Sequence, residues 1–79
     1  MYYAYVLKSL ANGALYKGQT DNLEIRLNQH NSGKSDYTSR KGPWTIAYYE
    51  EFNTREEALL REKYFKSAAG RRFIKKLKL

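Results

Sequence analysis

The sequence predicts a small α+β domain in which a mixed or antiparallel sheet of three strands is flanked by helices. Three observations predict this class. Stretches rich in aromatic and branched residues, typical of strands, occur at residues 2–7, 14–17 and 44–52. Two capping-box patterns introduce stretches with helical spacing of apolar residues. The 79 residues also lie near the size at which one core is just sufficient, so we expect a single domain over residues 1–79.

The first two strands are predicted to form a hairpin. Residues 2–7 are Tyr-Tyr-Ala-Tyr-Val-Leu, and residues 14–17 are Ala-Leu-Tyr-Lys. Asn12-Gly13 lies between them and favours a type I′ turn, because both residue types tolerate a positive φ. Gly18 follows the second strand, and its missing Cβ would let a backbone segment or a ligand approach closely.

The first helix is predicted to end at about Asn31, with Gly33 as its C-terminal stop. The segment Thr20-Asp21-Asn22 offers N-cap residues, and Asp21 with Glu24 resembles a capping box.

Two polar side chains of this helix are predicted to lie beside its apolar stripe. At 100° per residue, Leu23 and Leu27 form the stripe, and Arg26 and His30 lie next to it on one face. A guanidinium group suits a phosphate or the negative charge of its transition state. An imidazole can supply a hydrogen bond or a proton transfer there. A polar rim with an ordinary, satisfied histidine explains the pair equally well, so both interpretations stay open.

The second half of the chain predicts a strand followed by two helices. Residues 44–52 form the longest strand, and Thr54 with Glu57 forms a capping box that opens a helix over residues 55–67. We expect Gly70 to break this helix. A short basic helix over residues 71–79 follows, and its packing face consists of Phe73, Ile74 and Leu77. The order of the strands in the sheet does not follow from the sequence.

Glu62 is the sharpest single signal in the chain. Its neighbours on the helical wheel are apolar: Ala58, Leu59, Phe65 and Ala69. A carboxylate that faces a core is costly unless it is paired or holds a metal ion. A magnesium site often uses only one or two protein carboxylates, with water and phosphate as the other ligands. For an isolated glutamate, a surface salt bridge to Arg61 or Lys66 is the commoner arrangement, and it remains the alternative.

The charge of the chain favours a polyanionic partner. Fifteen Lys and Arg residues outnumber 8 Asp and Glu residues, which gives a formal net charge of +7. Nucleic acid is the commonest such partner, although a basic composition that serves solubility alone is the alternative. The basic residues cluster in one loop and one tail. We expect DNA contacts, largely to phosphates, from Lys17, Lys34, Tyr37, Arg40, Lys41, Arg71, Arg72, Lys75 and Lys76.

Composition excludes several classes. The chain has no cysteine and one histidine, so disulfides, thiolate chemistry and a histidine-based zinc site are excluded. Apolar runs of about three residues are far shorter than the roughly 20 residues of a membrane span. Residues 2–7 lack the basic start and long apolar stretch of a signal peptide. We therefore expect a protein of the cytoplasm that does not enter the membrane.

An ordered set of motifs runs along the chain: Tyr3-Ala4-Tyr5, Tyr16-Lys17-Gly18, Arg26, His30 and Glu62. Taken singly, Tyr5 and Tyr16 are ordinary strand residues. As a set, the motifs resemble the GIY-YIG nuclease domain, whose superfamily includes the N-terminal nuclease module of the excision-repair incision subunit. Through Tyr37-Thr38 and Gly42-Pro43, the chain is most similar to the small stand-alone bacterial members. The resemblance covers nearly the whole chain.

The resemblance implies a metal-dependent DNA endonuclease that hydrolyses phosphodiester bonds in DNA repair or recombination. It assigns catalytic roles to Tyr5, Tyr16, Arg26 and Glu62, with His30 as an auxiliary histidine. Glu62 would hold one divalent metal ion, Mg²⁺ or Mn²⁺. A phenol titrates near pH 10, so a tyrosine becomes a base only when a cation such as Lys17 or the metal ion lowers its pKa. Which tyrosine is the base stays open.

The chain departs from the family pattern at two points. Only the tyrosines and the final glycine of the two motifs are retained, and Gln19 stands where repair-type members carry a lysine. These departures leave the activator of the base undefined. The alternative function is a nucleic-acid-binding module that lacks catalysis or cuts only with a protein partner.

Overall fold

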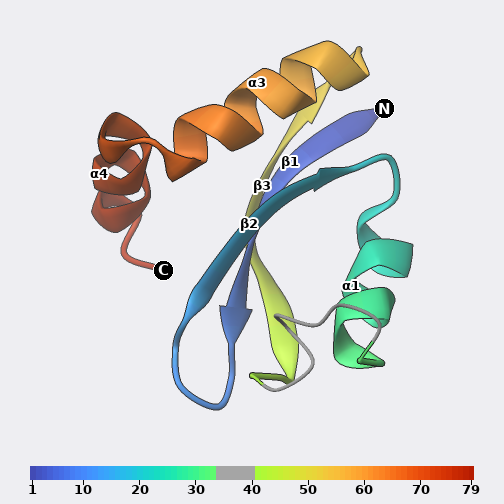
Figure 1. Ribbon diagram of the computed structural model, residues 1–79, viewed down its shortest axis with the longest axis vertical. Helices are drawn as coiled ribbons and strands as arrows, with labels where there is room; N and C mark the ends of the chain where they lie inside the picture. The colour runs from blue at the N-terminus through green and yellow to red at the C-terminus, as the bar shows by residue number, and fades with distance from the viewer. Residues whose placement is uncertain (34–40) are drawn as a thin grey trace.

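The computed structural model describes residues 1–33 and 41–79, and it confirms the α+β class. The described residues form three strands and three helices, which are shown in Figure 1. In chain order these are β1 (Tyr2–Ser9), β2 (Leu15–Thr20), α1 (Leu23–Asn31), β3 (Trp44–Phe52), α3 (Arg55–Lys66) and α4 (Ala68–Lys76). Within these described ranges, no helix is long and apolar enough to cross a membrane.

The sheet is antiparallel throughout, with the strand order β2-β1-β3. In the central strand, Tyr5 pairs with Gly18 of β2 on one side and with Tyr49 of β3 on the other. Helices α3 and α4 lie on one side of the sheet, and α1 lies on the opposite side (Figure 1). Because both faces are covered, four consecutive residues of β1, from Ala4 to Leu7, are buried.

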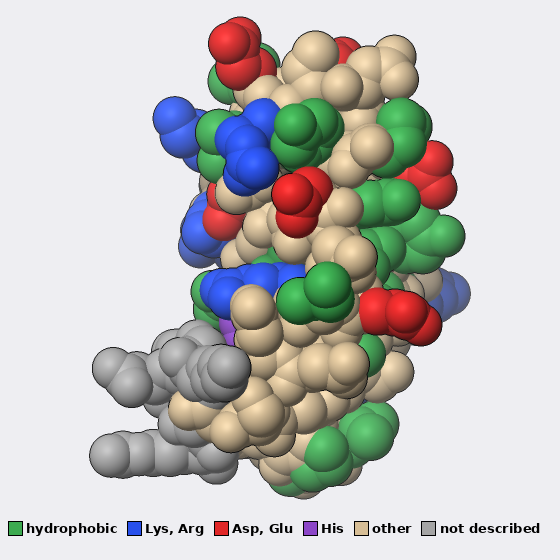
Figure 2. All heavy atoms as spheres, turned by 90° about the vertical axis from the view of Figure 1, so that its right-hand side faces the viewer, with side chains coloured by type: hydrophobic (Ala, Val, Ile, Leu, Met, Phe, Trp, Pro, Cys, Tyr) green, Lys and Arg blue, Asp and Glu red, His purple; other side chains and the backbone are tan. Residues whose placement is uncertain are grey.

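The alternation of side chains along the strands divides the core into two parts. Ala4 and Val6 pack with Phe65 and Ile74 beneath α3 and α4. On the α1 side, the core consists of Tyr5, Leu7 and Trp44, with Tyr16, Leu23 and Leu27 packed against it. Outside this core, the α1 side presents polar and charged side chains interspersed with hydrophobic ones (Figure 2). Two small cores thus share one sheet, and each strand contributes to both.

The connection between β1 and β2 is longer than the two-residue type I′ turn that Asn12-Gly13 predicts. Gly13 has a φ of 76°, but Asn12 does not share the positive φ that a type I′ turn requires. The side chain of Ser9 decides the outcome, because its Oγ accepts hydrogen bonds from the backbone N–H groups of Ala11 (3.1 Å) and Asn12 (3.2 Å). The backbone N–H of Ser9 bonds to the carbonyl of Ala14 at 2.8 Å and closes the loop.

The N-cap and the end of α1 agree with the prediction, whereas the predicted capping box does not form. Asn22 is the N-cap, and its Oδ1 accepts from the backbone N–H of Ile25 at 3.0 Å, so the Asp21–Glu24 capping box does not form. Gly33 follows the helix with a φ of 84°, as expected for a C-terminal stop.

Thr54 caps the start of α3 as predicted, whereas the end of this helix is not as predicted. Thr54 Oγ1 accepts from the backbone N–H of Glu57 at 3.2 Å and donates to its carboxylate at 3.0 Å. The chain leaves helical geometry at Ser67, whose Oγ then accepts from the backbone N–H of Gly70 and caps α4. Ala69 accordingly belongs to α4 and is exposed, so the prediction that it joins the apolar face of α3 is wrong.

Gly70 has a packing role and does not break a helix. It lies in the first turn of α4 and is buried, at the point where α4 turns back against α3. A Cβ atom added there would lie 1.7 Å from the carbonyl oxygen of Tyr64 and 2.7 Å from the Cα of Phe65. Because both neighbours are backbone atoms, no side-chain rotation can relieve the overlap.

We therefore expect Gly70→Ala to lower the free energy of unfolding by about 3 kcal/mol, the upper end of what overpacking costs. Ala69→Ser, at the exposed preceding position, is the control and should change stability by less than about 0.5 kcal/mol. Denaturant unfolding of the three proteins measures both effects. Equal stability of Gly70→Ala and the parent would contradict the close crossing of α3 and α4.

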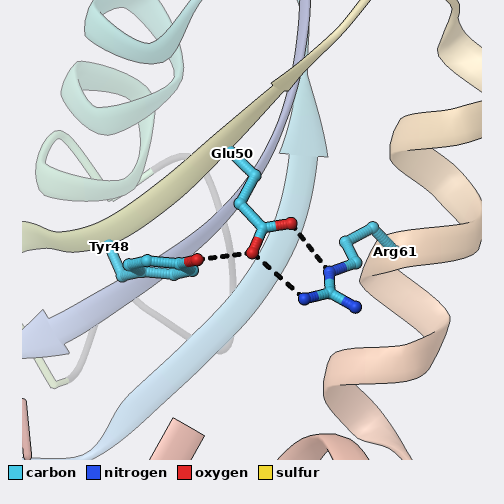
Figure 3. Close-up of polar contacts among 3 residues, drawn as sticks. All are labelled: Tyr48, Glu50 and Arg61. Atoms are coloured by element: carbon cyan, nitrogen blue, oxygen red, sulfur yellow. Dashed lines mark hydrogen bonds and ion pairs between the residues drawn. The ribbon is translucent and has the colours of Figure 1, made fainter. Parts of the chain in front are cut away.

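A polar network joins α3 to β3 (Figure 3). Arg61 donates from Nε to Glu50 Oε1 at 2.7 Å and from Nη2 to Glu50 Oε2 at 3.1 Å, and the Tyr48 hydroxyl donates to the same carboxylate. The guanidinium group also lies 4.4 Å from the ring centroid of Tyr64. A bidentate pair of this kind fixes orientation as well as distance, so it sets the rotation of α3 over the sheet. It also excludes Arg61 as the partner of Glu62.

Candidate active site

A hydrogen-bonded pair of buried polar side chains lies on the α1 side of the sheet. Tyr5 Oη is 3.1 Å from His30 Nε2, and the two residues are 2% and 1% exposed. Asn31 holds the end of α1 against β3, since its side chain accepts from the Trp44 N–H at 2.7 Å and donates to the Trp44 carbonyl at 3.1 Å. His30 is the only buried residue of α1, whereas the predicted stripe residues Leu23 and Leu27 are half-buried.

Tyr16 and Gly18, both in edge strand β2, complete the surroundings of this pair. The ring centroids of Tyr16 and His30 are 4.8 Å apart in an edge-on arrangement. The ring of Tyr5 lies across Gly18, where an added Cβ would be 2.4 Å from Tyr5 Oη. The close approach expected at Gly18 is therefore present, and the group that approaches is the phenol of Tyr5. This contact places the Tyr5 hydroxyl beside β2, which is an edge strand of the sheet.

Arg26 supplies the positive charge beside the two tyrosines. Its pKa is raised above the ordinary value, chiefly by a hydrogen bond to Tyr5, with a further contribution from Tyr16. Its Nη1 also donates to Gln29 Oε1 at 3.0 Å, which holds the half-buried side chain in place. In Figure 2 the histidine is visible only as a small purple area next to a basic side chain. We refer to Tyr5, Tyr16, Arg26 and His30 as the tyrosine–histidine cluster.

Burial and charge fix the protonation states in this cluster. Burial, together with the charge of Arg26, lowers the pKa of His30 to about 4, so the imidazole is neutral near pH 7. Burial raises the pKa of Tyr5, and although Arg26 opposes this shift, the charges of Tyr16 and Glu62 add to it. The Tyr5 phenol is therefore protonated near pH 7.

The low pKa of His30 makes stability depend on pH. The unfolded chain takes up this proton near pH 6.5, while the folded chain does so near pH 4. The unfolded state therefore binds more protons between these values, and stability is lost as the pH falls. We expect the free energy of unfolding to drop by about 2 kcal/mol between about pH 7 and about pH 5.

His30→Gln is the control for this pH effect, because it removes the titrating group. The pKa values of the neighbouring Tyr5 and Arg26 are raised above their ordinary values, so these two groups do not titrate in this range. Denaturant unfolding at the two pH values measures the difference between the proteins. Parallel pH profiles for the parent and His30→Gln would contradict the neutral, buried histidine.

Glu62 lies on the side of the sheet opposite α1. It lies on α3, which contacts β1 and β2, and its side chain is 18% exposed. Burial is the main cause of the raised pKa of Tyr5, and the charge of Glu62 makes the smallest contribution to it. Oε2 accepts from Lys66 Nζ at 3.0 Å, so the salt bridge considered as the alternative forms with Lys66. The side chain thus combines a surface ion pair with partial burial near Tyr5.

A metal ion at Glu62 would have few protein ligands. Within residues 1–33 and 41–79, no group of three or more His, Cys, Asp or Glu side chains could hold a metal ion. One carboxylate, completed by water and phosphate oxygens, fits the habits of Mg²⁺, which keeps several waters. The donor set therefore fits Mg²⁺ or Mn²⁺ that arrives with a phosphate, and does not form a closed protein cage.

The predicted DNA contacts are distributed over several parts of the molecule. Lys17 points to the α4 side of the sheet and lines a pocket there with Arg71 and Lys75. The cation beside the tyrosines is therefore Arg26, and the expectation that Lys17 would serve there is not met. Arg72 and Lys76 are exposed on α4, and Lys41 is half-buried. Lys34, Tyr37 and Arg40 lie outside the described residues.

Three structural features of the site have no strong local signal in the sequence. The Glu50–Arg61 pair joins residues 11 apart, and the Asn31–Trp44 bonds join residues 13 apart. The missing side chain of Gly18 predicts a close approach, but nothing in the sequence identifies Tyr5 as the group that fills the space.

The three-stranded antiparallel sheet with helices on both faces is a fold of the nuclease type. A family model described as the GIY-YIG catalytic domain matches residues 1–77, and the chain belongs to this family. The resemblance drawn from the ordered motifs is therefore confirmed.

The relatives are small proteins named UPF0213. The protein from Bacillus licheniformis is 47% identical over 66 residues, which cover 82% of this chain and 67% of the relative. The protein from Staphylococcus haemolyticus is 36% identical and covers 94% of this chain and 90% of the relative. The solution NMR structure of a UPF0213 protein from Bacillus halodurans matches with a TM-score of 0.56 and 32% identity, covering 99% of this chain and 86% of that protein.

Proposed function

We propose that this protein is a DNA endonuclease that hydrolyses phosphodiester bonds at the tyrosine–histidine cluster. The observation that carries this proposal is the buried Tyr5–His30 pair with Arg26 beside it. A domain of this size has little stability to lose, and apolar residues would fill the same space without the desolvation of polar groups. A neutral imidazole, a phenol and a guanidinium beside one edge strand are groups that suit a phosphodiester.

Each residue then has a distinct role. Arg26 binds the phosphate and stabilises the negative charge that develops on it. Tyr5, whose pKa is raised, stays protonated and donates a hydrogen bond. Tyr16 is therefore the residue that we assign as the base toward the attacking water, with its ring held against the neutral His30. His30 fixes the hydroxyl of Tyr5 through the 3.1 Å bond.

Glu62 is the residue that would hold a divalent metal ion, Mg²⁺ or Mn²⁺. When bound, such an ion polarises a phosphate oxygen and stabilises the leaving oxygen. The carboxylate is suited to this role because it is partly buried and lies close enough to Tyr5 for its charge to contribute to the raised pKa of that residue. Lys66 neutralises the carboxylate in the absence of a metal ion, and its side chain is 55% exposed and can move aside.

Substrate choice would depend on DNA structure more than on sequence. The basic residues are suited to phosphates, and phosphate contacts position a protein without specifying sequence. We therefore propose a role in DNA repair or recombination, where unusual DNA structures arise.

Incubation with supercoiled, branched and single-stranded DNA, each with and without magnesium or manganese, tests the proposal. We expect cleavage that requires the metal ion. Arg26→Gln, purified in parallel, is the control for contaminating nucleases and should not cut. Salt-sensitive binding without cleavage under any condition would refute the endonuclease and support the alternative function, a nucleic-acid-binding module.

A further inference from the structure

A cationic groove lies between β2 and α4, on the side of the sheet opposite α1. Its volume is about 350 Å³. Three of its lining residues are aliphatic and four are basic, and no acidic residue is among them. They are Leu15, Ile74 and Leu79, and Lys17, Arg71, Lys75 and Lys78. We call this feature the α4 groove, and its composition combines an apolar floor with a positively charged rim.

The α4 groove begins directly across edge strand β2 from the tyrosine–histidine cluster. Lys17 lies in the chain between Tyr16 and Gly18, and successive side chains of a strand point to opposite faces. Tyr16 therefore faces the cluster while Lys17 faces the groove, and their Cα atoms are about 3.8 Å apart. The Tyr5 hydroxyl lies against Gly18, the next residue of the same strand. The two sites are thus separated only by the thickness of the sheet edge.

We propose that the α4 groove binds the phosphate backbone of the same nucleic-acid strand that occupies the candidate active site, close to the bond that is cut. This inference rests on the proposed function. The four cations complement consecutive phosphates, and none of the described side chains that line the groove is acidic. The aliphatic floor suits the sugars, and because no aromatic ring of the described residues lines it, it offers no stacking platform for bases. The groove therefore adds affinity without sequence preference.

The path between the two sites indicates which form of nucleic acid fits. A strand that contacts both sites must turn over the edge of β2. A single strand makes such a turn easily, whereas duplex DNA resists bending, with a persistence length of about 50 nm. The groove therefore favours a single-stranded segment next to the scissile phosphodiester.

A matched pair of variants tests this groove. Arg71→Gln/Lys75→Gln removes two groove cations, and Arg55→Gln/Lys63→Gln on α3 removes one arginine and one lysine that do not line the groove. All four side chains are exposed, so both variants should unfold at the parental temperature. Their net charges are equal, so any difference between them reports position.

Binding of labelled oligothymidylate, measured without metal over a range of salt concentrations, is the readout. We expect the slope of log affinity against log salt to fall by about 1.4 in the groove variant, from two contacts at about 0.7 each. The control variant should keep the parental slope. Equal slopes in the two variants, or a loss that affects duplex but not single-stranded binding, would overturn the proposal.

Cleavage, measured separately with magnesium, distinguishes this inference from the function on which it rests. If the parent cleaves DNA and the two variants have equal slopes, the proposed role of the α4 groove is refuted and the endonuclease proposal stands. Loss of slope confined to the groove variant, without cleavage by the parent, supports the groove as a phosphate site and overturns the endonuclease.

Discussion

Tyr16→Phe is expected to lower the rate of DNA cleavage by about 10²–10⁴-fold while leaving the domain folded. The substitution removes only the phenolic oxygen, the atom that we propose to take a proton from water. The aromatic ring would keep its edge-on contact with His30, whose centroid lies 4.8 Å away. Single-turnover cleavage with magnesium and thermal unfolding of both proteins measure the two effects.

Two further tyrosine variants make this test specific. Tyr49 lies opposite Tyr5 in the sheet and is 47% exposed, so Tyr49→Phe is the control and should cut at the parental rate. Tyr5→Phe removes the hydrogen bond to His30 and should also impair cleavage. If Tyr5→Phe is inactive while Tyr16→Phe cuts at the parental rate, Tyr5 is the base. Parental rates for both would remove the tyrosines from the mechanism.

Glu62→Gln is expected to abolish both cleavage and the stabilisation of the domain by magnesium. A ligand that binds only the folded state adds about 2.7 kcal/mol at a concentration 100 times its Kd, and this gain should disappear with the carboxylate. Without metal, the variant should match the parent to within about 0.5 kcal/mol or exceed it slightly. The ion pair with Lys66 contributes little to stability because the lysine side chain is largely exposed. A carboxylate that is kept for function also does not serve stability.

Thermal unfolding of both proteins, with and without magnesium, measures these effects beside a cleavage assay. Glu56→Gln, at an exposed position in the first turn of the same helix, is the control and should retain the magnesium response. A Glu62→Gln protein that is destabilised and still cleaves DNA would refute the proposed role of Glu62.

Local chemistry explains which parts of the fold the sequence predicted. The third strand occupies residues 44–52 as predicted, and the N-cap at Thr54 and the stop at Gly33 form as expected. Each of these signals depends on side chains within a few positions of one another. Two of the incorrect local predictions, at Asn12-Gly13 and at Asp21, failed because a neighbouring side chain offered a competing hydrogen bond.

The candidate site shows the same division. The composition of the cluster followed from the ordered motifs, because Arg26 and His30 share a helix face and the tyrosines lie in strands. The hydrogen bond between Tyr5 and His30 could not be predicted, since it depends on how α1 docks against β1. The sequence offers both Arg61 and Lys66 as partners of Glu62. Because Glu50 of β3 binds Arg61, Glu62 pairs with Lys66.

By itself, the sequence determined the strands and helices, the residue types available for chemistry and the excess of positive charge. The tertiary structure decided the strand order, the side of the sheet on which each residue acts and the neighbours that set each pKa. Lys17 and Tyr16 illustrate the difference, because adjacent residues of one strand serve the α4 groove and the tyrosine–histidine cluster. The physical reason is that local propensity is set by neighbours in the chain, whereas burial, charge and packing are set by residues that only folding brings together.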